Sequence, residues 1–499
     1  MAILRQFPAL AILTLIASGL MIIPALHAAR AGHLEITQVF LVHGALFAVL
    51  GALVGLALAN RRPRHAARYH LTTILLTYLV LPVMLATPLA ALAPGLGIGR
   101  AYFEMLSSLT TTGATVIKAP NLLPESLHLW RALIGWVGGF MVLVATFSVL
   151  APLNLGGFEI REREDLRLTS RRGGTIEEAS ARGLRICRSI GPIYAVFTGI
   201  LSLLLIAAGD RPFVAVCHAM ATISTSGVSP VGGLEGGTSG RLGEMAIGLF
   251  LLAAISHRSL TFTLRRGERP RLNDPEVRLM LISVLGITLL LFLRSFAGAA
   301  EIARQDNLLA AVRAIWGSLF TVLSFLTTTG FESRDWTTMR LWSDLPDPGT
   351  ILLGVAAMGG GVATTAGGIK LLRLYALYRQ GQRELDLLIH PSSVWPHGQG
   401  EFAITARGAR IAFVFLMLFL SSVAMAMIAL TLAGLTFEQA LALAIAAMTT
   451  TGPAIRTLGG GLAYADLSDA ALAILGATMI VGRIEPLVLI ALFNPAWWR

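Results

Sequence analysis

Four short runs of hydroxyl-bearing residues, each ending in glycine, decide how this chain is expected to fold: Thr110-Thr111-Thr112-Gly113, Ser224-Thr225-Ser226-Gly227, Thr327-Thr328-Thr329-Gly330 and Thr449-Thr450-Thr451-Gly452. Each run lies between a short apolar stretch and a long one. Repetition at equivalent places indicates four copies of one structural unit. Four loops that converge on one axis can line a narrow path with backbone carbonyls, which replace the hydration shell of a cation. The pattern therefore predicts ion permeation.

The composition predicts a membrane protein. Of the 499 residues, 55% are hydrophobic and 13% are charged, whereas about a quarter of the residues in soluble domains are charged. Apolar stretches such as 409–434 are long enough to cross a bilayer, which takes roughly 20 helical residues. We therefore expect an all-α polytopic membrane protein. Four pseudo-symmetric helix–re-entrant loop–helix repeats would surround a central pore, with two further transmembrane helices at the N-terminus.

The net charge of +11 is expected to reflect membrane topology and not nucleic-acid binding. Arginines cluster in loops that follow every second apolar span, among them 61–68, 161–185 and 265–271. Because cytoplasmic loops are enriched in basic residues, we expect these loops on the cytoplasmic side. The alternative is that they bind anionic lipid headgroups or an acidic partner.

The four expected repeats share one internal order. In each, a long apolar span is followed by a segment too short to cross a bilayer, then by a run, then by a second long span. Non-helical backbone at membrane depth is tolerated where it lines a water-filled cavity or is buried in protein. The expected units are 1–70 for the two N-terminal helices and 71–152, 184–264, 277–378 and 407–499 for the four pore repeats.

The glycine that ends each run has a backbone reason. A row of carbonyls that face one axis requires backbone angles that residues with a Cβ adopt poorly. The residue before each glycine can add a carbonyl or hydroxyl oxygen. The alternative is a turn or a small-residue contact between helices. The candidate ion-binding residues are Thr111, Thr112, Gly113, Thr225, Ser226, Gly227, Thr328, Thr329, Gly330, Thr450, Thr451 and Gly452.

A second glycine-rich stretch interrupts the apolar span that starts near residue 349. It cannot form a stable helix, because each glycine costs about 1 kcal/mol relative to alanine, so the break should line a cavity. A kink for helix packing is the alternative. Its candidate functional residues are Gly359, Gly360, Gly361, Thr364, Thr365, Gly367 and Gly368. Arg483, a charge inside an apolar span, is a functional candidate by default, although it could simply pair with Glu485. Lys370, at a helix end, could simply mark the cytoplasmic interface.

The chain resembles a known family, the membrane subunits of the Trk/Ktr potassium transporters. The likeness extends over roughly residues 70–499. Beyond the runs it is carried by Trp130-Arg131-Ala132-Leu133-Ile134-Gly135-Trp136-Val137-Gly138-Gly139, by Gly359–Lys370, and by Gly482-Arg483-Ile484-Glu485-Pro486 with the later Phe493-Asn494-Pro495. The two additional N-terminal spans are more similar to the Trk branch than to the shorter Ktr branch.

The resemblance implies potassium uptake across the bacterial inner membrane, with K⁺ bound as substrate at the residues of the runs. It implies that the glycine-rich loop gates the pore below the runs, with Lys370 beside it, and that Arg483 projects into the pore as an electrostatic barrier. It also implies a homodimer on a cytosolic nucleotide-binding regulatory ring, which the basic loops could contact. Ser226, Val228 and Thr450 depart from the family pattern, so a less selective or sodium-permeable variant is an open possibility.

Other classes of function fit the sequence less well. A secondary transporter of another small solute would also use broken helices, but it typically has inverted repeats and not four similar ones. A membrane-embedded enzyme would need paired acids or a histidine cluster inside spans, and the sequence has neither. It also has no phosphate-binding loop of the Gly-x-x-x-x-Gly-Lys-Ser/Thr form. We expect a transport protein without a cofactor, and not an enzyme.

Overall fold

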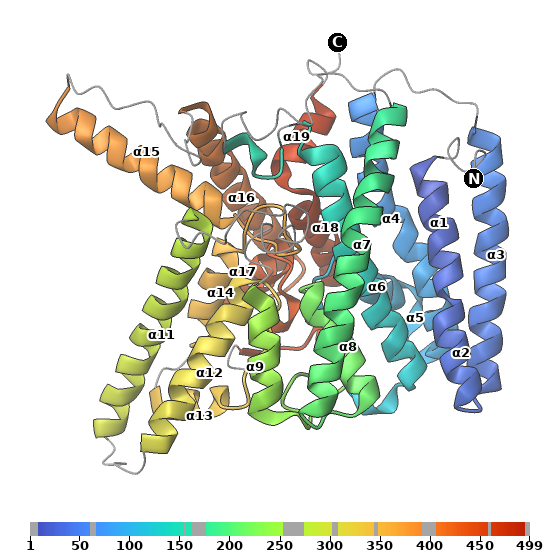
Figure 1. The fold of residues 1–499 in the computed structure, drawn as a ribbon, viewed down its shortest axis with the longest axis horizontal. Helices are drawn as coiled ribbons and strands as arrows, with labels where there is room; N and C mark the ends of the chain where they lie inside the picture. Colours follow the sequence, from blue (N-terminus) through green and yellow to red (C-terminus); the bar gives the residue numbers. More distant parts are fainter. Residues whose placement is uncertain are drawn as a thin grey trace.

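The computed structural model describes residues 8–59, 66–153, 155–160, 176–252, 274–301, 308–343, 348–391, 406–457 and 461–494. Within these ranges all regular structure is helical (Figure 1). Residues 161–175 and 265–271, which hold most of the two basic clusters expected to contact a partner or lipid, lie outside the described residues, as does Pro495.

Seven helices of the described residues are long and apolar enough to cross a membrane, or eight if one bent pair is counted as a span. This confirms the expectation of a polytopic α-helical membrane protein. The seven spans are α1–α2 (Ala9–Leu20 and Ile22–Arg30), α3 (Leu34–Leu58), α4 (Ala66–Leu92), α6 (Glu125–Ala145 and the turn to Leu150), α7 (Ile176–Ala207), α11 (Pro275–Glu301) and α16 (Ala406–Leu432). Figure 1 shows α1 and α3 at one edge of the molecule, next to α4.

Four shorter helices place the runs. They are α5 (Gly97–Leu109), α8 (Pro212–Ile223), α12 (Leu308–Leu326) and α17 (Phe437–Met448), and each ends on the residue just before a run. Each packs against the long span that precedes it, as an antiparallel hairpin. All four runs are therefore presented in the same way, from the C-terminal end of a short helix, where the helix dipole favours a positive charge.

Two later spans are broken. Helices α14 (Gly349–Met358) and α15 (Leu371–Ile389) are separated by the glycine-rich segment, as the glycines predict. The second long span expected in the fourth repeat is instead two helices, α18 (Asp469–Ile484) and α19 (Pro486–Phe493), that meet at 88°. Pro486 accounts for the bend, because a proline disfavours helical backbone in the preceding residue, and Glu485 has a φ of 73°.

Two further helices complete the described fold. Helix α9 (Gly240–Leu251) lies in the part of the unit 184–264 where the second long span is expected, and residues 253–273 lie outside the described ranges. Helix α13 (Trp336–Ser343) follows the third run and packs against α11 and α12.

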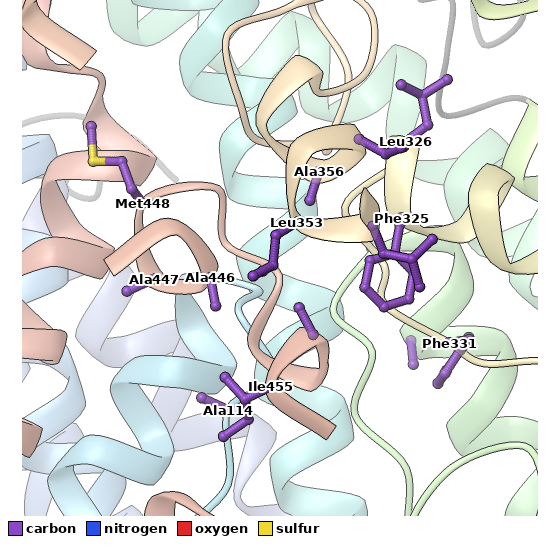
Figure 2. Close-up of a cluster of buried hydrophobic side chains, with 14 of the residues drawn as sticks. Ala114, Phe325, Leu326, Phe331, Leu353, Ala356, Ala446, Ala447, Met448 and Ile455 are labelled. Atoms are coloured by element: carbon purple, nitrogen blue, oxygen red, sulfur yellow. The ribbon is translucent and has the colours of Figure 1, made fainter. Parts of the chain in front are cut away.

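The hydrophobic core surrounds the runs. Figure 2 shows side chains that flank them, such as Ala114 after the first run, Phe325 and Phe331 on either side of the third, and Met448 before the fourth. These four side chains are at most 2% exposed. Because protein interiors are close-packed, these neighbouring side chains restrict the movement of the runs.

Candidate functional site

All four runs share one backbone conformation through their third residue. The second residue of each run is a threonine with positive φ: 54° at Thr111, 53° at Thr225, 57° at Thr328 and 55° at Thr450. The N–H of the third residue donates back to the carbonyl five residues earlier, with N···O distances of 2.8–2.9 Å. This arrangement ends a helix in a left-handed residue, a place usually taken by glycine. A β-branched residue there is an outlier, and strain of this kind is concentrated at functional sites.

The first and third hydroxyls of every run bond to each other. The pairs are Thr110–Thr112 (2.8 Å), Ser224–Ser226 (3.0 Å), Thr327–Thr329 (3.1 Å) and Thr449–Thr451 (3.1 Å). The third hydroxyls, which the sequence offered as ion ligands, therefore help to fix the loop. The first residue of each run was not among the candidate residues, although it carries a hydroxyl in all four runs, which is the sequence signal for this pairing.

The runs, numbered 1 to 4 in chain order, meet in a closed ring. A Cβ placed on Gly113 would lie 2.1 Å from the Ser226 carbonyl oxygen, so run 1 touches run 2. A Cβ on Gly227 would lie 2.2 Å from the Thr329 carbonyl oxygen, which joins run 2 to run 3. On the other two sides, Gly330 packs against Pro453 of the fourth loop, and the Gly452 N–H donates to the Thr112 carbonyl at 2.6 Å. The order is 1–2–3–4–1, so runs 1 and 3 face each other.

The fourth glycine differs from the others. Gly113, Gly227 and Gly330 have positive φ values of 72°, 64° and 76°. Gly452 does not, and it begins a 3-10 turn, Gly452–Thr457. The backbone argument for glycine thus holds at three runs. At the fourth, glycine is required by closeness, because a Cβ there would lie 2.3 Å from the backbone nitrogen of Ala114.

The glycine-rich loop, residues 359–370, lies against three of the runs. The Gly367 N–H donates to the Thr328 hydroxyl (2.8 Å), and the Thr225 hydroxyl donates to that of Thr365 (3.1 Å). A Cβ on Gly367 would come within 2.2 Å of the Thr449 carbonyl oxygen. Among the described residues the buried hydroxyls of Thr111 and Thr450 have no hydrogen-bond partner. Such orphaned oxygens in a ring are suited to bind a cation.

The ends of this loop are pinned together. A Cβ on Gly368 would lie 2.7 Å from the Cα of Gly359, so the two backbones touch at a distance that only glycines allow. The N–H groups of Ile369 and Leu371 donate across the neck of the loop, to the carbonyls of Ala357 and Gly360, at 3.0 Å each. The break is thus a compact loop with a closed neck, and not a simple helix kink.

Arg483 and Lys370 both bind the loop's backbone. Arg483 Nη1 donates to the Thr365 carbonyl at 2.8 Å, and Lys370 Nζ donates to the Ala366 carbonyl. Both line one pocket under the runs, together with Tyr78 of α4 and Thr146 at the end of α6. The predicted barrier residue and the predicted loop are therefore in direct contact, and the alternative of an Arg483–Glu485 ion pair is replaced by a different pairing of Glu485.

That pairing is with Arg373, a residue the sequence did not single out. Arg373 Nε donates to Glu159 (2.9 Å) and its Nη2 to Glu485 (2.7 Å), and its guanidinium lies 3.7 Å from the Phe415 ring centroid. The arginine is fully buried. Arg373 Nη1 also donates to the carbonyl of Ile369 in the loop, at 3.4 Å, so this buried charged network joins the loop to the bend at Glu485. Separately, Glu276 of α11 accepts the Val362 N–H of the loop at 3.0 Å.

Beyond the runs, on the side away from the loop, one carboxyl group has a shifted pKa. Burial, with a smaller contribution from the nearby carboxylate of Glu235, raises the pKa of Glu332, two residues after Gly330, to about 7. Its charge therefore changes near neutral pH.

Comparison with known proteins decides the family. Residues 36–232 and 247–497 match the family model TrkH, described as "Cation transport protein". The chain belongs to the TrkH family. The match includes all four runs, the glycine-rich loop and Arg483. It confirms the resemblance seen in the sequence, and the family is one of transport proteins and not of enzymes.

Relatives of this TrkH-family chain match over nearly its whole length. It is 29% identical to the Trk system potassium uptake protein TrkH of Salmonella typhimurium, over 98% of each chain. It is 30% identical to that of Halomonas elongata, over 91% of this chain and 92% of the other. The crystal structure of the potassium transporter TrkH from Vibrio parahaemolyticus has a TM-score of 0.82 at 26% identity and covers 99% of both chains. The TrkH-family protein is thus a multi-pass protein of the bacterial inner membrane.

Proposed function

We propose that this protein takes up K⁺ through the ring formed by the four runs. The closed ring carries the proposal, because it brings together four loops, each with a left-handed threonine at its second residue, around one axis. The names of the relatives, Trk system potassium uptake proteins, support K⁺ as the substrate. The backbone carbonyls of the twelve candidate ion-binding residues, with the unpartnered hydroxyls of Thr111 and Thr450, would replace water around the ion. The membrane potential would supply about 2.3 kcal/mol per charge for each 100 mV.

The glycine-rich loop is proposed as the gate. It hydrogen-bonds to two of the strained threonines and crowds a third run, so an ion leaving the ring would meet it. Arg483 would hold the loop in this place and add a positive charge below the ring. Gly359 and Gly368 would form the hinge, because their backbones are in contact. We further propose that the units 71–152, 184–264, 277–378 and 407–499 are the four pore repeats.

Two finer points belong to the same proposal. Serine in the second run and the different backbone at Gly452 would allow some Na⁺ to pass. The name "Trk system" of the relatives supports regulatory subunits as partners, and we propose a homodimer that binds a cytosolic nucleotide-binding ring and membrane lipid. The alternative, transport of another small solute, is less favoured because all four loops carry the same left-handed threonine and close into one ring.

The test is growth of a potassium-uptake-deficient bacterium at low K⁺, with and without a cognate regulatory subunit. Expression of this protein should restore growth, and purified protein in liposomes should take up Rb⁺ as a substitute for K⁺. Membrane-inserted protein that neither restores growth nor passes Rb⁺ would contradict the proposal. Competition of Na⁺ with Rb⁺ would measure selectivity.

A further inference from the structure

Two buried carboxylates lie behind the runs and have no part in the proposal so far. Glu104 is on the short helix α5, and Glu244 is on α9. They are 0% and 2% exposed, respectively. Burying a carboxylate costs free energy unless hydrogen-bond donors and opposite charges surround it. The donors around each carboxylate therefore show which segment of the chain it fixes in place.

Glu104 holds the chain just past run 1. Its Oε2 accepts the Thr115 hydroxyl (3.2 Å) and the Val116 N–H (2.9 Å). These residues lie two and three positions after Gly113. Its Oε1 accepts Arg131 Nε at 2.6 Å, and Arg131 also donates to the Thr115 hydroxyl at 3.0 Å. The carboxylate, the arginine and the segment after the run form one closed set of bonds.

Glu244 does the same past run 3. Its Oε1 accepts the Arg334 N–H (2.7 Å), and its Oε2 accepts the Ser333 hydroxyl (2.8 Å). Trp316 Nε1 supplies a third donor at 2.9 Å. The donors match those at run 1: a hydroxyl side chain and the N–H of the next residue. The two carboxylates come from different kinds of helix, so this likeness is not a simple product of the repeat.

The other two runs are held differently. Past run 2, the Ser229 hydroxyl contacts His218 Nε2 at 2.9 Å, and the buried carboxylate of Asp210 lies 3.9 Å from His218 Nδ1, so a carboxylate reaches this segment only through the histidine. At run 4, the Tyr464 hydroxyl donates to the Gly452 carbonyl at 3.1 Å. The carboxylates that accept hydrogen bonds directly from the segment after a run therefore belong to runs 1 and 3, which face each other across the ring.

We propose that Glu104 and Glu244 are positioning residues that set the discrimination between K⁺ and Na⁺, by fixing the opposed runs 1 and 3. Hydrogen bonds to a charged group contribute about 1.5–3 kcal/mol each, more than neutral ones. The carbonyls of runs 1 and 3 are thus less free to close around a smaller ion than those of runs 2 and 4. This inference rests on the proposed ion filter.

The experiment compares Rb⁺ and Na⁺ flux in liposomes. Glu244→Gln keeps the shape of the side chain and removes its charge, and it leaves no buried cation unpaired. We expect the Rb⁺/Na⁺ flux ratio to fall about tenfold, which corresponds to about 1.4 kcal/mol. The matched control is Asp469→Asn. Asp469 pairs with Arg100 at 3.2 Å, and Arg100 is on the same helix as Glu104. Neither residue of this pair lies in a segment just after a run, so the ratio should stay at the wild-type value.

Ser333→Ala and Thr115→Val provide a second test, because each removes one hydroxyl donor to a carboxylate and keeps the carboxylate itself. Their flux ratios should fall by a smaller factor. If Glu244→Gln does not fold, these two variants decide. Folded variants with the wild-type ratio would overturn the inference and leave the proposed function intact. Wild-type protein that passes no Rb⁺ would instead remove the proposed function, and the inference with it.

Discussion

Gly113→Ala is the most direct test of the ring. The new Cβ would lie 2.1 Å from the Ser226 carbonyl oxygen and 3.2 Å from its carbon, whereas real Cβ contacts are essentially never shorter than 3.0 Å. Run 1 or run 2 must therefore move by about 0.9 Å, and overpacking of this kind costs about 1–3 kcal/mol. The φ of 72° adds strain of about 1–3 kcal/mol for a residue with a Cβ.

Two glycines of α5, the short helix before run 1, separate the effect of the backbone strain from that of the close contact. Gly97 has a φ of 68° and Gly99 has no positive φ, and neither has an atom within 4 Å of its would-be Cβ. Gly97→Ala thus carries backbone strain alone, and Gly99→Ala should be neutral or slightly stabilising, since alanine favours a helix. Only Gly113→Ala displaces a carbonyl of the ring.

The assay is Rb⁺ uptake into liposomes, with thermal unfolding of each purified variant measured alongside. We expect Gly113→Ala to lose at least about tenfold in uptake, because a shift worth more than 1.4 kcal/mol at the ion site changes rates by that factor. Gly97→Ala should lower stability and keep its uptake. Wild-type uptake by folded Gly113→Ala would refute the reasoning, since the contact between runs 1 and 2 would then have no bearing on the ion path.

Three further predictions concern the glycine-rich loop, the buried network around Arg373, and Glu332. Gly367→Ala places a Cβ 2.2 Å from the Thr449 carbonyl oxygen, so the loop should be displaced and Rb⁺ leak should rise in the absence of partner subunits; unchanged leak would argue against the gate. Arg373→Met leaves two carboxylates buried and unpaired, which should cost about 3–5 kcal/mol of stability, whereas Arg379→Met, on the exposed part of the same helix, should change it by less than about 0.5 kcal/mol. Glu332, with its pKa of about 7, is neutral in acid and charged above neutral pH, so cation uptake should rise with external pH from 6 to 8 and Glu332→Gln should flatten that rise. Because this pKa is raised, the group stabilises the fold most below its ordinary pKa, and that contribution is lost as the pH rises through 7.

Much of the architecture follows from the linear pattern. The short helices α8 and α17 lie directly before their runs, where the sequence predicts segments too short to cross a bilayer. The break after Met358 follows from glycine's poor helix propensity, and the four runs point to a repeated unit because each follows a segment too short to span a bilayer. The long apolar stretch around Pro486 predicts one span by its hydropathy, although the proline itself disfavours helical backbone in the residue before it. The structure has two helices there, on either side of Glu485.

The charged contacts could not be predicted in this way. Arg373 meets Glu159 and Glu485 across separations of 214 and 112 residues, and Glu244 meets Ser333 and Arg334 from another hairpin. No local pattern encodes such distant pairs, because their geometry depends on how the hairpins pack.

The sequence by itself determined that four threonine–glycine runs lie at the ends of short helices in a membrane, since hydropathy and glycine propensity are local properties. Only the tertiary structure decided that the runs close into a ring in chain order, that Thr111 and its equivalents carry the strain, and that runs 1 and 3 are held by buried carboxylates. Those features depend on which backbone segments touch and which donors surround each buried charge. Both are set by the packing of segments that are far apart in the sequence.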